Sequence, residues 1–242
     1  MILSLLEIVM ATFSIIIVAI FALVGIEIIK VYKKTNERVY LCFGLTWIGI
    51  VEAWIPSAIV LIGFFMTGGS ILPPTVYFLI AIAGYPLTTL IWITGFTDIL
   101  YKNKQKLFQL IFGIGEVLFE IIFLVFLFTD ANLIGSFKSP VDVAYAPFVS
   151  LYILISLCII LLTGLLISII SIRGGEPENK LRGYLLCAAL ITLFIGGLLD
   201  AAAELDILGV VIVRLLVISS AVEFYCAFVM PDFIKRLFKV ET

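Results

Sequence analysis

Long apolar runs separated by short polar breaks dominate this sequence. We count seven runs of roughly 20 or more residues, each long enough to cross about 30 Å of hydrocarbon as an α-helix. The breaks between them carry charged and turn-forming residues, as in KKTNER and RGGEPENK. The pattern predicts an all-α membrane protein in which residues 1–242 form a single seven-helix bundle. The predicted spans are about 5–30, 39–65, 74–101, 107–128, 144–172, 182–203 and 207–230.

The composition excludes a soluble globular domain. Hydrophobic residues make up 63% of the chain and charged residues 13%, whereas a soluble domain is about half apolar and a quarter charged. Folding in water would leave too much apolar surface uncovered, so a lipid bilayer must cover it. The net charge of −2 gives no reason to expect nucleic acid as a partner.

The positions of lysine and arginine predict the orientation. All but two of the 15 basic residues lie in or beside the first, third and fifth breaks and the tail. The exceptions are Lys138 in the fourth break and Arg214 inside the seventh run. By the positive-inside rule, the N-terminus is expected outside and the C-terminus in the cytoplasm of a multi-pass cell-membrane protein. The basic residues on the expected cytoplasmic side are Lys30, Lys33, Lys34, Arg38, Lys102, Lys104, Lys106, Arg173, Lys180, Arg182, Lys235, Arg236 and Lys239.

The chain contains no histidine, which excludes histidine-ligated haem, histidine-containing zinc sites and Ser-His or Cys-His catalytic pairs. Its four cysteines, Cys42, Cys158, Cys187 and Cys226, lie in apolar runs without a CxxC spacing. They are typical of small buried apolar residues. We therefore expect no metal, no cofactor and no enzymatic activity.

Several charged residues fall inside the predicted spans, where each costs at least about 2.5–3.5 kcal/mol near a helix centre. Glu116 and Glu120 are one helical turn apart and share a face. Arg214 and Glu223 are separated by half a rotation and lie on opposite faces of the seventh span. The predicted intramembrane polar site comprises Glu52, Glu116, Glu120, Arg214, Glu223 and Tyr225.

The depth of Arg214 suggests its partners. An arginine at that level can reach Glu52 or Glu120, or extend outward to Asp206 or Glu204. One arginine cannot neutralise three carboxylates, so some of them should be protonated at neutral pH. Such carboxyls occur in proton relays and cation paths, and also as neutral anchors between helices.

The predicted arrangement resembles the microbial rhodopsins in topology, and AGYPLTTLIWITGFTD (83–98) is similar to their third helix. That resemblance would imply retinal bound to a lysine of the seventh helix. The seventh span here carries Arg214, which cannot form a Schiff base, so retinal is not expected. TDILYK (97–102) stands where a G-protein-coupled receptor would carry its E/D-R-Y motif.

Three functions fit these features. The first is a receptor or sensor with a site among spans two, three, four and seven, which binds a small molecule or ion and is read by a separate cytoplasmic partner. The second is a small transporter or channel moving protons, cations or a solute past Glu52, Glu116 and Glu120. The third is an assembly subunit whose charges pair with another membrane protein or with a second copy of the chain.

Overall fold

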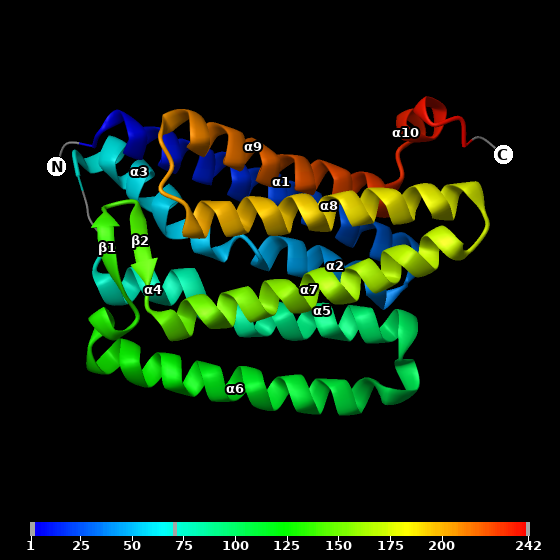
Figure 1. Ribbon diagram of the computed structural model, residues 1–242, viewed down its shortest axis with the longest axis horizontal. Helices are drawn as coiled ribbons and strands as arrows, with labels where there is room; N and C mark the ends of the chain where they lie inside the picture. Colours follow the sequence, from blue (N-terminus) through cyan, green and yellow to red (C-terminus); the bar gives the residue numbers. More distant parts are fainter. Residues whose placement is uncertain (1–2, 70–71, 241–242) are drawn as a thin grey trace.

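The structure is a computed structural model that describes residues 3–69 and 72–240. Helices form almost all of it, and one short β-hairpin precedes α7 (Figure 1). In chain order the elements are α1 (Leu5–Thr35), α2 (Arg38–Gly49), the 3-10 turn η1 (Glu52–Trp54), α3 (Ile55–Thr67), α4 (Pro74–Ile82), α5 (Tyr85–Leu100), η2 (Lys102–Lys104), α6 (Gln105–Thr129), η3 (Ala131–Leu133), β1 (Gly135–Ser139), β2 (Asp142–Tyr145), α7 (Pro147–Arg173), α8 (Pro177–Ala202), α9 (Ile207–Val229) and α10 (Asp232–Leu237).

Seven helical segments of the described chain are long and apolar enough to cross a membrane. They are α1, α2 with α3, α4 with α5, α6, α7, α8 and α9. The prediction of a mainly helical chain with seven helices able to span a membrane is thereby confirmed. The protein is an integral membrane protein, and its apolar outer surface is the surface that lipid covers.

Six of the seven spans form a ring, and the remaining span, α6, lies outside it. In the ring α1 packs between α2 and α9, α9 packs on α8, and α8 packs on α7. Contacts of α5 with α7 and with α2 close the ring, whereas α6 packs mainly on the outer side of α5 (Figure 1). The interior of the bundle is therefore bounded by α1, α2, α5, α7, α8 and α9.

Two spans are interrupted near their middle. The second changes from α2 to the turn η1 and resumes as α3, where Pro56 occupies the first turn. The third breaks after α4, and α5 begins with Tyr85 and Pro86. Proline has no backbone N–H and its ring displaces the carbonyl four residues earlier, so each interruption has a local cause.

The hairpin corrects the prediction for the fifth span. That span was expected to start near residue 144, but β2 occupies 142–145 and α7 begins at Pro147. The hairpin turn packs against the second and third spans, since Ser57 Oγ donates to the carbonyl of Val141 at 2.7 Å. The ring of Tyr77 contacts Phe137 of β1, with 5.0 Å between centroids. The fourth break therefore covers one end of the bundle.

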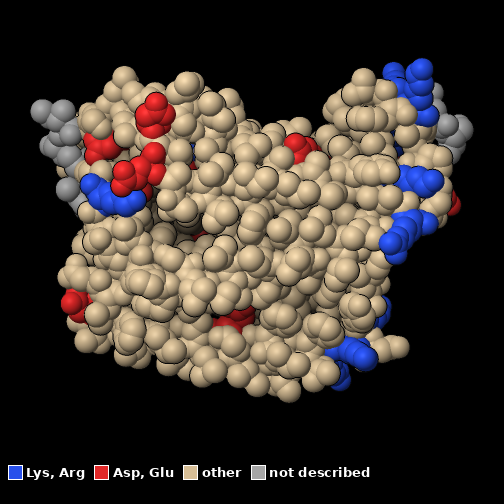
Figure 2. Space-filling model, in the orientation of Figure 1, with Lys and Arg blue, Asp and Glu red and all other residues tan. Residues whose placement is uncertain are grey.

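Charged side chains separate along the bundle (Figure 2). Lysine and arginine gather at the end that carries the α7–α8 connection and α10, and acidic residues gather at the end that carries the hairpin. We name these the basic end and the acidic end. The wide band between them shows few charges, and some acidic atoms there lie in hollows of the surface (Figure 2).

Aromatic rings fill the centre of the ring of helices. Trp47 of α2 stacks on Phe224 of α9 with 3.5 Å between centroids, and on Phe21 of α1 with 5.4 Å. Phe43 and Trp92 extend this cluster toward α5, and all five side chains have no exposed surface. These five residues, the aromatic plug, form a close-packed layer between the two ends of the bundle.

Candidate functional site

An ion pair lies inside the acidic end, between α8 and α9. Arg214 Nε donates to Asp200 Oδ1 at 2.7 Å, and the two side chains are only 5% and 14% exposed. Arg214 Nη1 also donates to Ser14 Oγ of α1 at 2.9 Å. Removing one partner of such a buried pair leaves an uncompensated charge, which is strongly destabilising.

This pairing corrects the predicted partners of Arg214. Asp200 lies in the last turn of α8, within the predicted sixth span, but it was not among the predicted site residues. The sequence does carry a signal, because the three alanines after Asp200 favour helix continuation. The predicted partners that proved wrong are Glu52, Glu120, Glu204 and Asp206.

Trp54 of the second span contacts both members of this ion pair. Its indole Nε1 donates to Asp200 Oδ2 at 2.9 Å. The guanidinium carbon of Arg214 lies 5.7 Å from the centre of the Trp54 ring, within the range of a cation–π interaction. Both oxygens of Asp200 are thus used, and one carboxylate joins the second, sixth and seventh spans.

The hairpin brings a further acid toward this cluster. Asp142 opens β2, and the charges of Asp200 and Arg214 both act on it. Burial raises the pKa of Asp142, the charge of Lys138 opposes that rise, and the negative charge of Asp200 adds to it. We name Ser14, Trp54, Asp142, Asp200 and Arg214 the acidic-end site.

Glu52 occupies the same 3-10 turn as Trp54 but contacts a different span. Its Oε1 accepts a hydrogen bond of 2.6 Å from the amide of Gly84, in the break between α4 and α5. Glycine is required at this close approach, because a Cβ there would lie 2.8 Å from Glu52 Oε1. The other oxygen, Oε2, is buried and has no hydrogen-bond partner among the described residues.

Glu116 is buried on α6, and Glu120 is half-buried one helical turn away. The hydroxyl of Tyr152 donates to Glu116 Oε2 and so bridges α6 and α7, while the Tyr152 ring stacks on Phe119. Glu120 Oε2 is buried without a hydrogen-bond partner in the described chain. Glu120 is close enough for its charge to act on Glu52. The predicted carboxyls Glu52, Glu116 and Glu120 therefore form one neighbourhood, separate from Arg214.

Glu223 and Tyr225 lie in neither group. Glu223 Oε2 accepts from Thr192 Oγ1 of α8 at 2.9 Å. Tyr225 is partly buried and packs beside Leu181 in the apolar cluster of the basic end. The structure thus distributes the predicted site residues over three places along the bundle.

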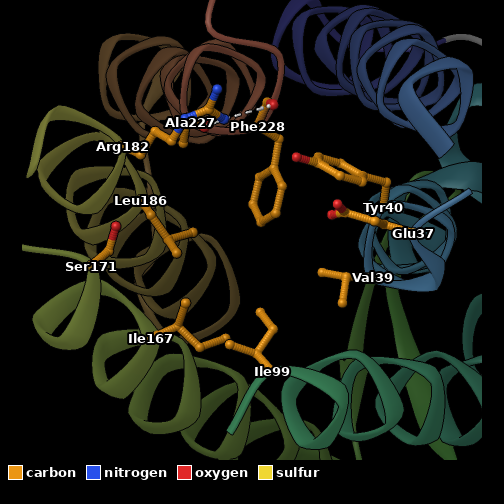
Figure 3. A pocket seen from close by; sticks show the side chains of 10 residues that line it. All are labelled: Glu37, Val39, Tyr40, Ile99, Ile167, Ser171, Arg182, Leu186, Ala227 and Phe228. Atoms are coloured by element: carbon orange, nitrogen blue, oxygen red, sulfur yellow. Dashed lines mark hydrogen bonds between the residues drawn. The ribbon is translucent and has the colours of Figure 1, made fainter. Parts of the chain in front are cut away.

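A pocket opens at the basic end, with a volume of about 240 Å³. Figure 3 shows it encircled by helix ends, with Glu37 and Tyr40 on one side and Arg182 and Ser171 on the opposite side. Arg182 Nη1 donates to the carbonyls of Ala227 and Phe228 at 3.1 Å each, near the last turn of α9. The complete lining is Glu37, Val39, Tyr40, Ile99, Ile167, Ser171, Arg182, Leu186, Ala227 and Phe228.

Comparison of the chain with protein-family models, curated proteins and solved structures gives no match. Within residues 3–69 and 72–240, no group of three or more cysteine, aspartate and glutamate side chains is placed to hold a metal ion. The fold and the buried polar groups define a multi-pass membrane protein with polar groups at separate places along the bundle and a pocket at one end.

Proposed function

We propose that this protein is a seven-helix membrane receptor or sensor coupled to a separate cytoplasmic partner. The acidic-end site would receive a small molecule or ion from outside, and the pocket of the basic end would face the cytoplasm. The positive-inside rule supports this orientation, since lysine and arginine gather at the basic end (Figure 2). A reporter fused after residue 242 is accordingly expected in the cytoplasm.

The observation that carries this proposal is the pair of contacts made by the turn η1. In three consecutive residues it holds Trp54, which bonds Asp200 of α8, and Glu52, which bonds the amide of Gly84. A change at the acidic-end site that moves Trp54 must therefore also act on the break between α4 and α5.

The third span can carry such a change to the basic end. α5 runs from the break at Gly84 to Leu100, and its Ile99 lines the pocket. A charged ligand that competes for Asp200 or Arg214 would release Trp54 and favour a second arrangement of η1. Interrupted helices between rigid segments are suitable hinges for this kind of shift.

The aromatic plug favours signalling over passage through the bundle axis. On α9 the order is Arg214, Phe224 and then Phe228 of the pocket, and on the second span it is Trp54, Trp47 and then Tyr40. The fully buried rings thus lie between the acidic-end site and the pocket. A close-packed apolar layer is a barrier to ions but transmits displacement.

Hydrogen–deuterium exchange in lipid nanodiscs tests this proposal. Asp200→Asn keeps the shape of the side chain but removes the charge that holds Arg214. The account predicts altered exchange of amides near residues 98–106 at the basic end, although the substitution lies at the acidic end. The control is Glu204→Gln, an exposed residue beyond the end of α8, which should change nothing there. Changes confined to the acidic end in Asp200→Asn would contradict the proposal.

A second candidate is proton or cation transfer through Glu52, Glu116 and Glu120. It is favoured by the buried Oε2 atoms of Glu52 and Glu120, which lack partners in the described chain. A buried carboxyl without a partner is costly as an anion and suited to accept a proton. In this reading, reconstituted vesicles carry a proton or cation flux that Glu116→Gln with Glu120→Gln abolishes. Vesicles that stay tight across a range of pH and cations, with folded protein, would exclude it.

A further inference from the structure

The pocket at the basic end has the features of a docking site for a protein segment. Its lining is mainly apolar, with Val39, Ile99, Ile167, Leu186 and Phe228 on different helices. Figure 3 shows these side chains projecting toward one another from different helices at the basic end, which the positive-inside rule assigns to the cytoplasm. An occupant would therefore come from the cytoplasmic side.

Basic residues outnumber acidic ones at this end of the bundle, although Glu37, Glu176 and Asp232 also lie there. Among the acidic residues of this end, Glu27 pairs with Lys30, Asp98 with Arg38, and Glu178 with both Arg182 and Lys235. These ion pairs neutralise acidic groups close to the helix ends. Exposed basic side chains lie at or beside helix ends of the same end of the bundle, and we name them the basic rim: Lys33, Lys34, Lys102, Lys104, Arg173 and Lys180.

Resting on the sensor function proposed above, we infer that the pocket binds an acidic amphipathic helix of the cytoplasmic partner. The apolar face of that helix would enter among Ile99, Leu186 and Phe228, and its acidic residues would contact the basic rim. An apolar helix face lying in an apolar groove is a recurrent mode of recognition, and complementary charge around the groove adds specificity.

Glu37 limits which residues of the occupant can enter the pocket. It is the acidic residue of the pocket lining, and it lies across the pocket from Arg182 (Figure 3). Arg182 is already bonded to Glu178 and to two carbonyls of α9. The inserted face of the occupant is therefore expected to be apolar, with its acidic residues outside the pocket where Glu37 does not oppose them.

The test uses a fluorescein-labelled synthetic peptide and the full chain in phosphatidylcholine nanodiscs. The peptide carries leucines at i, i+3, i+4 and i+7 and glutamates at the other positions, and a second peptide replaces every glutamate with lysine. Fluorescence anisotropy should show binding of the glutamate peptide and not of the lysine peptide. Ile99→Trp, which fills the pocket from its rim, should weaken binding by about tenfold or more.

The matched control is Leu107→Trp, which adds the same ring at an exposed apolar position near the same end. It should leave binding unchanged, and Val39→Trp should reproduce the effect of Ile99→Trp if the folded fraction is equal. Equal binding of both peptides, no binding of either, or insensitivity to Ile99→Trp and Val39→Trp would overturn the inference. Displacement of the peptide by short-chain phosphatidylglycerol would assign the basic rim to lipid headgroups and also overturn it. The exchange experiment with Asp200→Asn contains no peptide, so the sensor function and this docking site can fail independently.

Discussion

Asp200 and Trp54, 146 positions apart in the chain, are joined by a hydrogen bond of 2.9 Å from the indole N–H to the carboxylate. The other oxygen of Asp200 accepts from Arg214 at 2.7 Å. One carboxylate therefore connects the turn η1 of the second span to α9. The acidic-end site is thus a set of contacts between spans, and a change in those contacts can act on helix positions.

The buried ion pair should appear in a double-mutant cycle. Arg214→Ala leaves Asp200 unpaired and should lower the free energy of unfolding by about 3–5 kcal/mol. Adding Asp200→Asn should recover part of that loss, because the unpaired charge is then absent. The measurement is denaturant or thermal unfolding of the four proteins in micelles. Glu120→Gln is the control and should be additive with Arg214→Ala; additivity of Asp200→Asn would contradict the pair.

Gly84 should be intolerant of alanine. An added Cβ would lie 2.8 Å from Glu52 Oε1 and displace the carboxylate that accepts from the Gly84 amide. The expected loss of stability is about 1–3 kcal/mol. Gly113→Ala is the matched control, since a Cβ there meets nothing within 4 Å and alanine favours the helix. If neither substitution lowered the stability, the close contact between Glu52 and Gly84 would be contradicted.

The free energy of unfolding should depend on pH through the ionisation of the Asp142 carboxyl. Burial raises the pKa of Asp142 in the folded protein above its ordinary value. An acid with a raised folded pKa favours the folded state while protonated, and that contribution is lost as pH rises through the folded pKa. Asp142→Asn should remove this loss and be more stable than the parent above that pH. Unfolding followed from acidic to neutral pH checks this prediction, and identical pH profiles of the parent and Asp142→Asn would contradict it.

The spans could be predicted from sequence because membrane thickness imposes a minimum apolar length on each helix. The hairpin could not, since its strands of five and four residues lie within a polar loop and depend on packing against Ser57 and Tyr77. Depth along a helix could be estimated, but it suggested Glu52 or Glu120 as the partner of Arg214, and the structure pairs Arg214 with Asp200.

The rotation of each helix decides partners, and it was not predictable from one sequence. Arg214 turns toward Asp200 and Ser14, and Glu116 turns toward Tyr152 on α7. Nothing in the spacing of charges along a single helix specifies which neighbouring helix each charge faces. Packing between spans supplies that information.

The distance between η2, which follows α5, and the start of α8 at the basic end tests the central claim most directly. Spin labels on Lys104→Cys and Lys180→Cys, both exposed, would be placed in a background that replaces the half-buried Cys158 and Cys187. Double electron–electron resonance in nanodiscs should then show that the mean distance between the two labels shifts by about 2 Å or more in Asp200→Asn and in Trp54→Phe. Glu204→Gln should give the distribution of the parent. Identical distributions in all four folded proteins would contradict the claim that the acidic-end site controls the basic end.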